Sequence, residues 1–191
     1  MIVVLGSLNM DFVVRMEHLP AAGQTVLGRD FETLPGGKGA NQAHAAARLG
    51  ATVRMMGCVG RDAFGEQLKA SLVSAGVDVS GVEAVETHPT GVALISVDAA
   101  GQNSIVVAPG ANHAEIALSA DIFRGARVAL FQLETPLGTV RDGLTYARTA
   151  GATTILDPAP AQPLSRDLLT LVDIVTPNET EALLLLGRAP R

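Results

Sequence analysis

A glycine-rich segment with two side-chain hydrogen-bond donors is the first feature of this sequence that could do chemistry. Residues 36–43 read Gly-Gly-Lys-Gly-Ala-Asn-Gln-Ala. Glycine costs roughly 0.5–1 kcal/mol in a regular element, so a cluster indicates tight backbone geometry or close approach to another group. The alanine-rich residues 40–49, followed by Gly50, predict a helix that begins here. A helix N-terminus carries unpaired N–H groups and a positive dipole end, and Lys38 and Asn41 add donors. The segment therefore predicts a binding site for a polar ligand.

Two other glycine motifs do not fit this segment. A phosphate-binding P-loop needs glycine five residues before its last glycine and Ser or Thr after the lysine, but Glu32 and Gly39 occupy those positions. A dinucleotide-binding G-x-G-x-x-G directly follows a strand, whereas a short segment ending in Pro35 precedes these glycines and their spacing differs. A glycine turn that merely starts a helix remains the alternative.

Polar side chains recur just beyond several predicted strands. Asn9 and Asp11 follow the apolar run 2–5 and share one face if the chain is extended there. Three more polar residues follow later strands: Glu134 after 128–133, Asp157 after 153–156 and Asn178 after 174–175. Ligands of open α/β sheets bind outside the carboxyl ends of the strands, so these positions together indicate a site more strongly than any single motif.

The predicted elements that position these residues are of two kinds. Strands alternating with helices, from His113 onward, predict a parallel sheet with right-handed crossovers. The segments at about 11–34 and 91–108 read instead as antiparallel ribbons and predict a small separate sheet. Helices are predicted at 40–49, at 63–74 with Asp62 as its cap, at 114–120, at about 139–150, and from 180 to Gly187.

Composition excludes several classes of function. The 191 residues suffice for one substantial core, and 48% of them are hydrophobic. A net charge of −5 provides no basic surplus for nucleic acid. No apolar run is long enough to span a membrane. The one cysteine, Cys58, cannot form an internal disulfide, which fits a cytoplasmic location. The four histidines are scattered, which is poor support for a metal site.

Seven segments, taken together, resemble the ribokinase-like (PfkB) family of carbohydrate kinases. Besides 36–43, they are residues 6–11, 60–65, 90–93, 132–134, 157–161 and 176–181. The resemblance covers the whole chain. It implies an α/β fold, a ribokinase-like three-layer α/β/α sandwich of Rossmann-like type, here truncated. It also implies a small β-sheet lid, formed by segments 11–34 and 91–108, on an incomplete domain of residues 1–191.

The resemblance also implies an activity and partners. The activity is transfer of the γ-phosphoryl group of ATP to the 5-hydroxyl of D-ribose, with Mg²⁺ and activation by K⁺. The implied assembly is a homodimer formed through the lid. Another sugar kinase of the family, such as a fructokinase-like enzyme, and a catalytically inactive sugar-binding or dimerising fragment remain alternatives.

Position by position, the resemblance implies roles for nine residues. The implied sugar-binding residues are Asn9, Asp11, Gly37, Lys38, Gly39, Asn41 and Glu134. Asn178 would lie near the nucleotide, and Glu181 would contact Mg²⁺ through water. The alternatives are a turn cap for Asp11, an exposed surface carboxylate for Glu134 and a capping box for Asn178 with Glu181. Asp157 is expected to stabilise a turn and not to take part in catalysis.

No catalytic residue is expected within the chain. The second signature of the family, Gly-Ala-Gly-Asp, does not occur in the sequence. In the family its aspartate is the general base, and its backbone starts a helix that stabilises developing phosphate charge. The adenine pocket and the K⁺ ligands belong to the same later part. The sequence is therefore expected to be a fragment that lacks roughly the final third of a family member.

Overall fold

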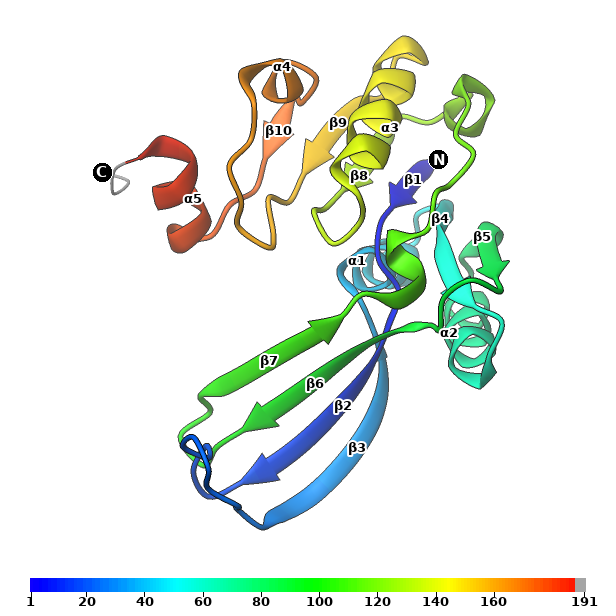
Figure 1. The fold of residues 1–191 in the computed structure, drawn as a ribbon. Helices are drawn as coiled ribbons and strands as arrows, with labels where there is room; N and C mark the ends of the chain where they lie inside the picture. Colours follow the sequence, from blue (N-terminus) through cyan, green and yellow to red (C-terminus); the bar gives the residue numbers. More distant parts are fainter. Residues whose placement is uncertain (188–191) are drawn as a thin grey trace.

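The computed structural model describes residues 1–187 and contains two separate sheets (Figure 1). The larger sheet has six strands in the order β10-β9-β8-β1-β4-β5, and its neighbouring strands are parallel. Its strands are β1 (Ile2–Leu5), β4 (Val53–Gly60), β5 (Asp78–Val85), β8 (Val128–Phe131), β9 (Thr153–Leu156) and β10 (Ile174–Val175). The predicted parallel sheet is thereby confirmed.

Helices cover both faces of this sheet, because successive apolar residues of a strand point to opposite faces. Val3 and Leu5 of β1 lie in one core with residues of α3 and α4, whereas Val4 lies in a second core with residues of α1 and α2. The helices are α1 (Lys38–Arg48), α2 (Ala63–Ser74), α3 (Leu137–Thr149), α4 (Arg166–Leu169) and α5 (Glu179–Leu186). The predicted three-layer arrangement is confirmed, and no helix within residues 1–187 is long and apolar enough to cross a membrane.

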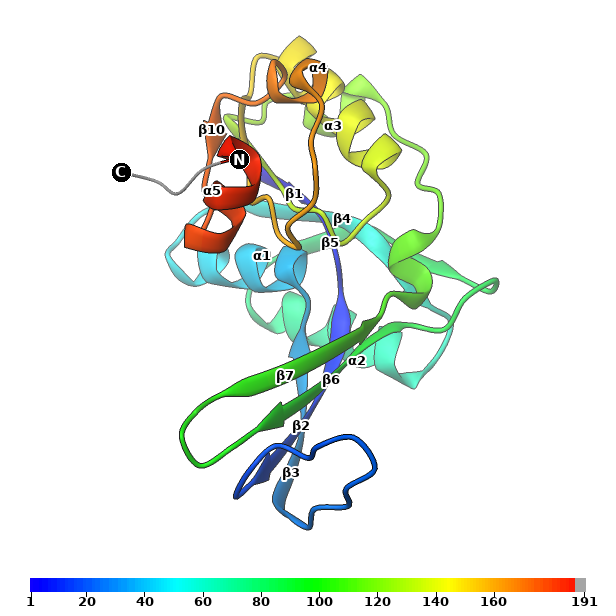
Figure 2. The ribbon, with the colours of Figure 1, turned by 60° about the vertical axis from the view of Figure 1, so that its left-hand side comes forward.

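The second sheet projects away from the helices and the parallel sheet (Figures 1 and 2). Its four strands lie in the order β3-β2-β6-β7; β2 pairs antiparallel with β3 and parallel with β6, and β6 pairs antiparallel with β7. They are β2 (Asn9–Met16), β3 (Gly28–Gly36), β6 (Gly91–Val97) and β7 (Asn103–Ala108). β2 follows β1 directly and β3 leads directly into α1, so the site segments lie where the two sheets meet.

The carboxylate of Asp62 joins the parallel sheet to the second sheet. Asp62 caps α2, as predicted, by accepting a hydrogen bond from Gly65 N. The same side chain accepts bonds from the backbone N (2.8 Å) and the hydroxyl (2.6 Å) of Thr90, which precedes β6. The hydroxyl of Thr90 in turn accepts from Gly60 N at the end of β4. These bonds fix the start of β6 relative to the parallel sheet.

The prediction of a short helix at 114–120 is wrong. The structure has 3₁₀ turns at η1 (Gly110–His113) and η2 (Ala120–Phe123), joined by a segment that is not helical. Ala114, Ile116 and Leu118 are buried or half-buried, while the residues between them are exposed. This alternation has the period of an extended chain, so the alanine-rich composition was misleading.

Candidate functional site

The hydroxyl of Ser7 brings three separate segments together. It donates a hydrogen bond of 2.5 Å to Glu134 Oε2, in the loop between β8 and α3, and it lies 3.5 Å from the N–H of Gly39 in α1. The carbonyl of Ser7 accepts from Ala40 N at 2.9 Å. Glu134 Oε2 also accepts from Lys38 N at 3.4 Å. The first turn of α1 is therefore held against the end of β1, with a carboxylate at its start.

The glycines of residues 37–39 are required by this close approach. Gly37 is the N-cap of α1 and has a φ of 93°, a conformation that L-residues with a side chain rarely adopt. A Cβ on Gly37 would also lie 2.6 Å from Asn9 N. A Cβ on Gly39 would lie 2.7 Å from the carbonyl carbon of Gly6. These glycines thus let the backbone of α1 pack directly against the segment that connects β1 to β2.

Asn9 and Asp11 share one face of β2, as predicted, at the point where this strand leaves the parallel sheet. Asn9 is only 2% exposed, and its Oδ1 accepts a hydrogen bond of 2.7 Å from Asn112 Nδ2. The carboxylate of Asp11 is half-buried and lies over Gly36, where a Cβ would overlap it. Both side chains therefore lie next to the glycine-rich start of α1.

Burial and a neighbouring carboxylate alter the acidity of Asp11. Removal of the side chain from water, as the larger cause, and the negative charge of Glu134 together raise the pKa of Asp11 to about 6. Asp11 and Glu134 are therefore close enough to interact, although β2 and the loop after β8 are far apart in the sequence. Two carboxylates that flank one helix N-terminus can accept hydrogen bonds from several hydroxyl groups of one ligand.

Asp157 extends this acidic edge toward α5. Burial raises its pKa, the positive charge of Lys38 lowers it, and the negative charges of Glu181 and Glu134 raise it. Its backbone N donates to Phe131 O at 2.9 Å, which fixes the start of the loop after β9. On balance the pKa of Asp157 is raised, and Asp157 lies close enough to Lys38, Glu134 and Glu181 for their charges to act on it.

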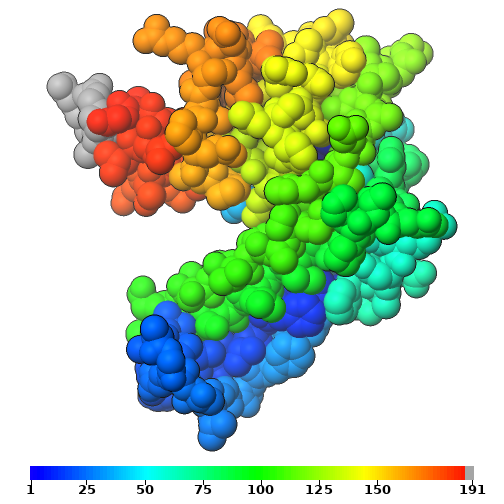
Figure 3. All heavy atoms as spheres, viewed as in Figure 1, coloured from blue at the N-terminus to red at the C-terminus, as the bar shows by residue number. Residues whose placement is uncertain are grey.

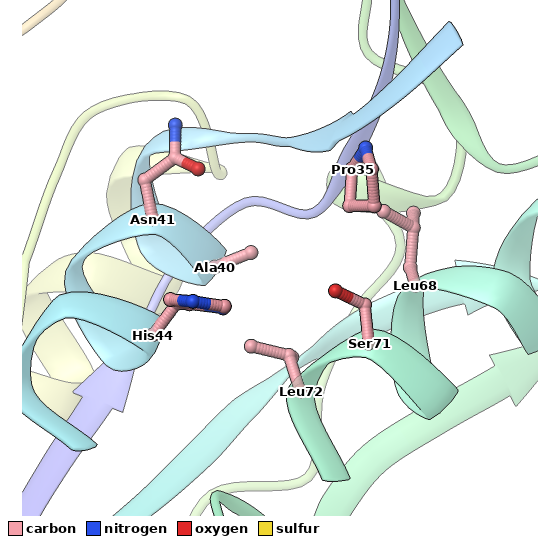
Figure 4. Close-up of a pocket in the computed structure, with 7 residues that line it drawn as sticks. All are labelled: Pro35, Ala40, Asn41, His44, Leu68, Ser71 and Leu72. Carbon is pink, nitrogen blue, oxygen red and sulfur yellow. The ribbon is translucent and has the colours of Figure 1, made fainter. Parts of the chain in front are cut away.

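Asn41 lies in the first turn of α1, where its backbone N donates to Gly37 O at 2.8 Å. It is exposed on α1 and lines a cavity of about 250 Å³ between α1, α2 and the end of β3. Figure 4 shows it beside His44, with Ser71 on the facing helix. The remaining residues that line this cavity are Pro35, Ala40, Leu68 and Leu72. Of the predicted site residues, Asn41 alone is among those that line it.

Asn178 and Glu181 form the capping box at the start of α5. Asn178 Oδ1 accepts from Glu181 N, while Glu181 Oε2 accepts from Asn178 N at 2.8 Å and Oε1 accepts from Asn178 Nδ2 at 2.9 Å. Glu181 is 8% exposed. The capping interpretation is therefore confirmed. Because a carboxylate oxygen has two lone pairs, each oxygen can also accept one bond from a metal-bound water.

A broad cleft separates the projecting sheet from the side of the molecule that carries α5 (Figure 3). The structure brings together Asn9, Asp11, Gly37, Lys38, Gly39 and Glu134 where the two sheets meet. Sequence reasoning missed Ser7 and Asn112 as residues that position this group. Asn112 follows a Pro-Gly turn, which is a local signal for a fixed polar residue, but its partners are 104 and 103 residues away in the chain.

Comparison with known protein families gives one match over nearly the whole chain. Residues 1–190 match the model of the pfkB family carbohydrate kinases. Ribokinase of Haemophilus influenzae is 44% identical over 191 residues, which cover 96% of this chain and 61% of the relative. Ribokinase of Bacillus subtilis is 45% identical over 188 residues, which cover 96% and 64%. The chain thus spans about three-fifths of the length of these relatives.

Solved structures give the same likeness. The Arabidopsis thaliana ribokinase complexed with ribose and ATP superposes with a TM-score of 0.88 at 36% identity, over 100% of this chain and 64% of the other. The Cryptococcus neoformans ribokinase in complex with ADP superposes with a TM-score of 0.86 at 33% identity, over 97% and 60%. The fold is therefore ribokinase-like, as predicted.

Proposed function

Because the chain belongs to the pfkB family of carbohydrate kinases, we propose that it supplies the sugar-binding part of a kinase that transfers the γ-phosphoryl group of ATP to the 5-hydroxyl of D-ribose. The observation that carries this proposal is the convergence of Asp11, Glu134 and the N-terminus of α1. Two acceptors and a group of N–H donors on one small surface suit a ligand whose periphery consists of hydroxyl groups.

Each side chain has a distinct part in holding the sugar. Ionised Asp11 accepts hydrogen bonds from two hydroxyls, and removal of the carboxylate leaves those hydroxyls unpaired, which costs roughly 1–3 kcal/mol. Lys38 and Asn9 donate to hydroxyl oxygens. Glu134 accepts from a further hydroxyl while its Oε2 is held by Ser7. The glycines at 37 and 39 allow the sugar to approach the backbone of α1 closely.

We propose a sugar contact for Asn41 on the resemblance. Its Cα lies one turn into α1, and its exposed side chain lines the cavity between α1 and α2. The amide of Asn41 is therefore free to donate to a sugar hydroxyl at this end of α1.

We propose that Asn178 and Glu181 serve the nucleotide and its metal. Within residues 1–187, no group of three or more His, Cys, Asp or Glu side chains could hold a metal ion directly. A single buried carboxylate that accepts from metal-bound waters fits Mg²⁺, which keeps most of its water shell. When bound with ATP, Mg²⁺ neutralises phosphate charge. ATP binding and activation by K⁺ are proposed from the resemblance alone, with no further residue of this chain assigned to them.

We also propose a homodimer formed through the second sheet. The strand register places Leu34, Ala93 and Val107 on the same face as Asp11, and Ile105 lies next to Val107 on that face. Ile105 is 51% exposed. A partner that covers this apolar face would remove it from water and shield the sugar site at its base.

Binding and turnover test different parts of this proposal. Calorimetric titrations of the 191-residue chain with D-ribose, D-fructose and adenosine should give the highest affinity for ribose. Preference for fructose would support the fructokinase-like alternative, and no binding would contradict the proposal. A second assay adds ATP and Mg²⁺ to chain and ribose. We expect no sugar phosphate, because the sequence contains no Gly-Ala-Gly-Asp segment; product formation would contradict that expectation.

A further inference from the structure

We propose that Asn112 is a positioning residue that fixes Asn9 as a hydrogen-bond donor to the sugar, an inference that rests on the proposed sugar-binding function. Asn112 lies in η1 and is 2% exposed. Its side-chain amide makes three hydrogen bonds with the segment that crosses between the two sheets. No ligand needs to contact Asn112 for this role.

The backbone of Leu8 determines how the amide of Asn112 is oriented. Asn112 Oδ1 accepts from Leu8 N at 2.8 Å, and Asn112 Nδ2 donates to Leu8 O at 3.0 Å. A backbone N–H can only donate and a carbonyl can only accept, so exchange of the oxygen and nitrogen of Asn112 would break both bonds. The assignment of Oδ1 and Nδ2 is thus fixed by chemistry and does not depend on how the amide is placed.

The orientation of Asn112 then determines that of Asn9. The same Nδ2 of Asn112 donates to Asn9 Oδ1 at 2.7 Å. If the amide of Asn9 were turned around, two NH₂ groups would face each other in a site where both residues are buried. The oxygen of Asn9 is therefore held toward Asn112, and the NH₂ group is the part that remains to serve a ligand.

Neighbouring backbone holds the two amides in place. η1 is anchored by the hydrogen bonds of Ala111 N to Pro89 O (2.8 Å) and of Asn112 N to Pro109 O (3.0 Å). Gly91 lies beside the amide pair, and a Cβ there would overlap both Asn9 Oδ1 and Asn112 Nδ2. The two amides therefore fit together only because residue 91 has no side chain.

This arrangement gives the two polar residues of β2 opposite hydrogen-bonding roles. Asp11, when ionised, can only accept, and Asn9 held by Asn112 can only donate. Adjacent hydroxyls of a sugar, or one hydroxyl that both donates and accepts, match such a donor–acceptor pair. An analogue that lacks the hydroxyl facing Asn9 leaves a nearly buried NH₂ group unpaired and should bind less tightly.

The substitution N112D tests this role, because it preserves shape and removes the two donated bonds. The introduced carboxylate still accepts from Leu8 N, but it attracts the NH₂ of Asn9 and turns the Asn9 oxygen toward the ligand. We expect the affinity for D-ribose to fall roughly tenfold or more by calorimetry. The control Q102E makes the same amide-to-carboxylate change in the exposed turn between β6 and β7 and should leave the affinity unchanged.

A double-mutant cycle separates positioning from a purely structural role. If Asn112 acts through Asn9, N112D should weaken binding little further when Asn9 is already replaced by alanine. The ribose analogue that lacks the hydroxyl facing Asn9 should bind wild type more weakly than ribose does. In N112D and in N9A, the affinities for this analogue and for ribose should be about equal. Equal losses from N112D in both backgrounds, or unchanged ribose affinity in N112D, would overturn the inference while the proposed function stands.

Side-chain amide exchange measured by NMR on the wild-type chain tests the hydrogen bonds without sugar and without a variant. The NH₂ protons of Asn112 should exchange with solvent far more slowly than those of exposed Asn103. Equal exchange rates would overturn the inference. Because the measurement uses the wild-type chain, it applies even if N112D does not fold. Slow exchange in a chain that binds no ribose would instead refute the proposed function and leave the amide arrangement intact.

Discussion

Ser7 and Glu134 lie 127 residues apart in the chain and share a hydrogen bond of 2.5 Å. The bond joins the end of β1 to the loop that follows β8, and the same carboxylate oxygen accepts from Lys38 N. Glu134 therefore lies at the N-terminus of α1, where the helix dipole favours a negative charge. The position of this carboxylate therefore depends on the hydroxyl of Ser7, which also accepts from Gly39 N.

The substitution S7A should therefore weaken sugar binding indirectly. It removes a hydrogen bond to Glu134 and leaves Gly39 N without its hydroxyl acceptor, so the carboxylate is less well fixed. We expect the dissociation constant for D-ribose to rise roughly tenfold in calorimetric titrations. S71A, in the cavity between α1 and α2, is the matched control and should bind like wild type. Wild-type affinity in S7A would contradict this account of Glu134.

Alanine substitutions at the two glycines that flank α1 should differ in their effect on stability. Gly37 and Gly50 both have positive φ, 93° and 89°. Alanine at Gly50 meets no atom within 4 Å, so it should cost only the conformational strain of about 1–2 kcal/mol. Alanine at Gly37 adds a clash 2.6 Å from Asn9 N. Urea denaturation should show a clearly larger loss of unfolding free energy for G37A, and equal losses would contradict the proposed close approach.

The raised pKa of Asp11 predicts how stability depends on pH. Since the pKa rises from 3.8 to about 6 on folding, the folded state binds more protons than the unfolded state between these values. The contribution of Asp11 to the unfolding free energy should therefore be greatest below about pH 4, fall as the pH rises to about 6, and stay level above that. The difference between wild type and D11N in urea denaturation isolates this contribution, and a difference that does not vary with pH would contradict it.

The same titration should govern sugar binding in the opposite direction. Only the ionised carboxylate accepts bonds from two hydroxyls, so the affinity for D-ribose should increase as the pH rises through about 6 and level off above it. Calorimetry between pH 5 and pH 8 measures this dependence. D11N should bind weakly at every pH, and a similar increase with pH in D11N would assign the effect to another group.

Neighbouring residues of β7 provide a matched test of the proposed dimer. The side chains of Ile105 and Val106 point to opposite faces of the second sheet, and they are 51% and 63% exposed. I105K places a charge on the face that carries Asp11 and should yield a monomer in light scattering. V106K should remain dimeric. A wild-type monomer, or a dimer that V106K alone disrupts, would contradict the choice of face.

Local signals in the sequence predicted much of the fold. The apolar runs and their alternation with helices predicted the parallel sheet, and Asp62 predicted the start of α2. Asn178 with Glu181 predicted the capping box of α5. In each case the signal lies within a few residues of the structure that it predicts. The segment 114–120 failed because alanine-rich composition outweighed a short alternation of buried and exposed positions.

The arrangement of the site could be predicted only in part. The polar residues beyond the strand ends indicated one edge of the sheet, because all strands of a parallel sheet end on the same side. The bonds of Ser7 to Glu134 and of Asn112 to Asn9 join segments more than 100 residues apart, which no local pattern specifies. The exposed position of Asn41 likewise depends on how α1 rotates against α2.

Calorimetric titration of wild type and D11N with D-ribose at pH 7.5 tests the central proposal most directly. The substitution preserves the shape of the side chain and replaces one acceptor oxygen by a donor. Wild type should bind one ribose per chain, D11N should bind at least roughly tenfold more weakly, and the exposed control D142N should match wild type. No saturable binding by wild type, or equal affinities for wild type and D11N, would contradict a sugar site built around Asp11.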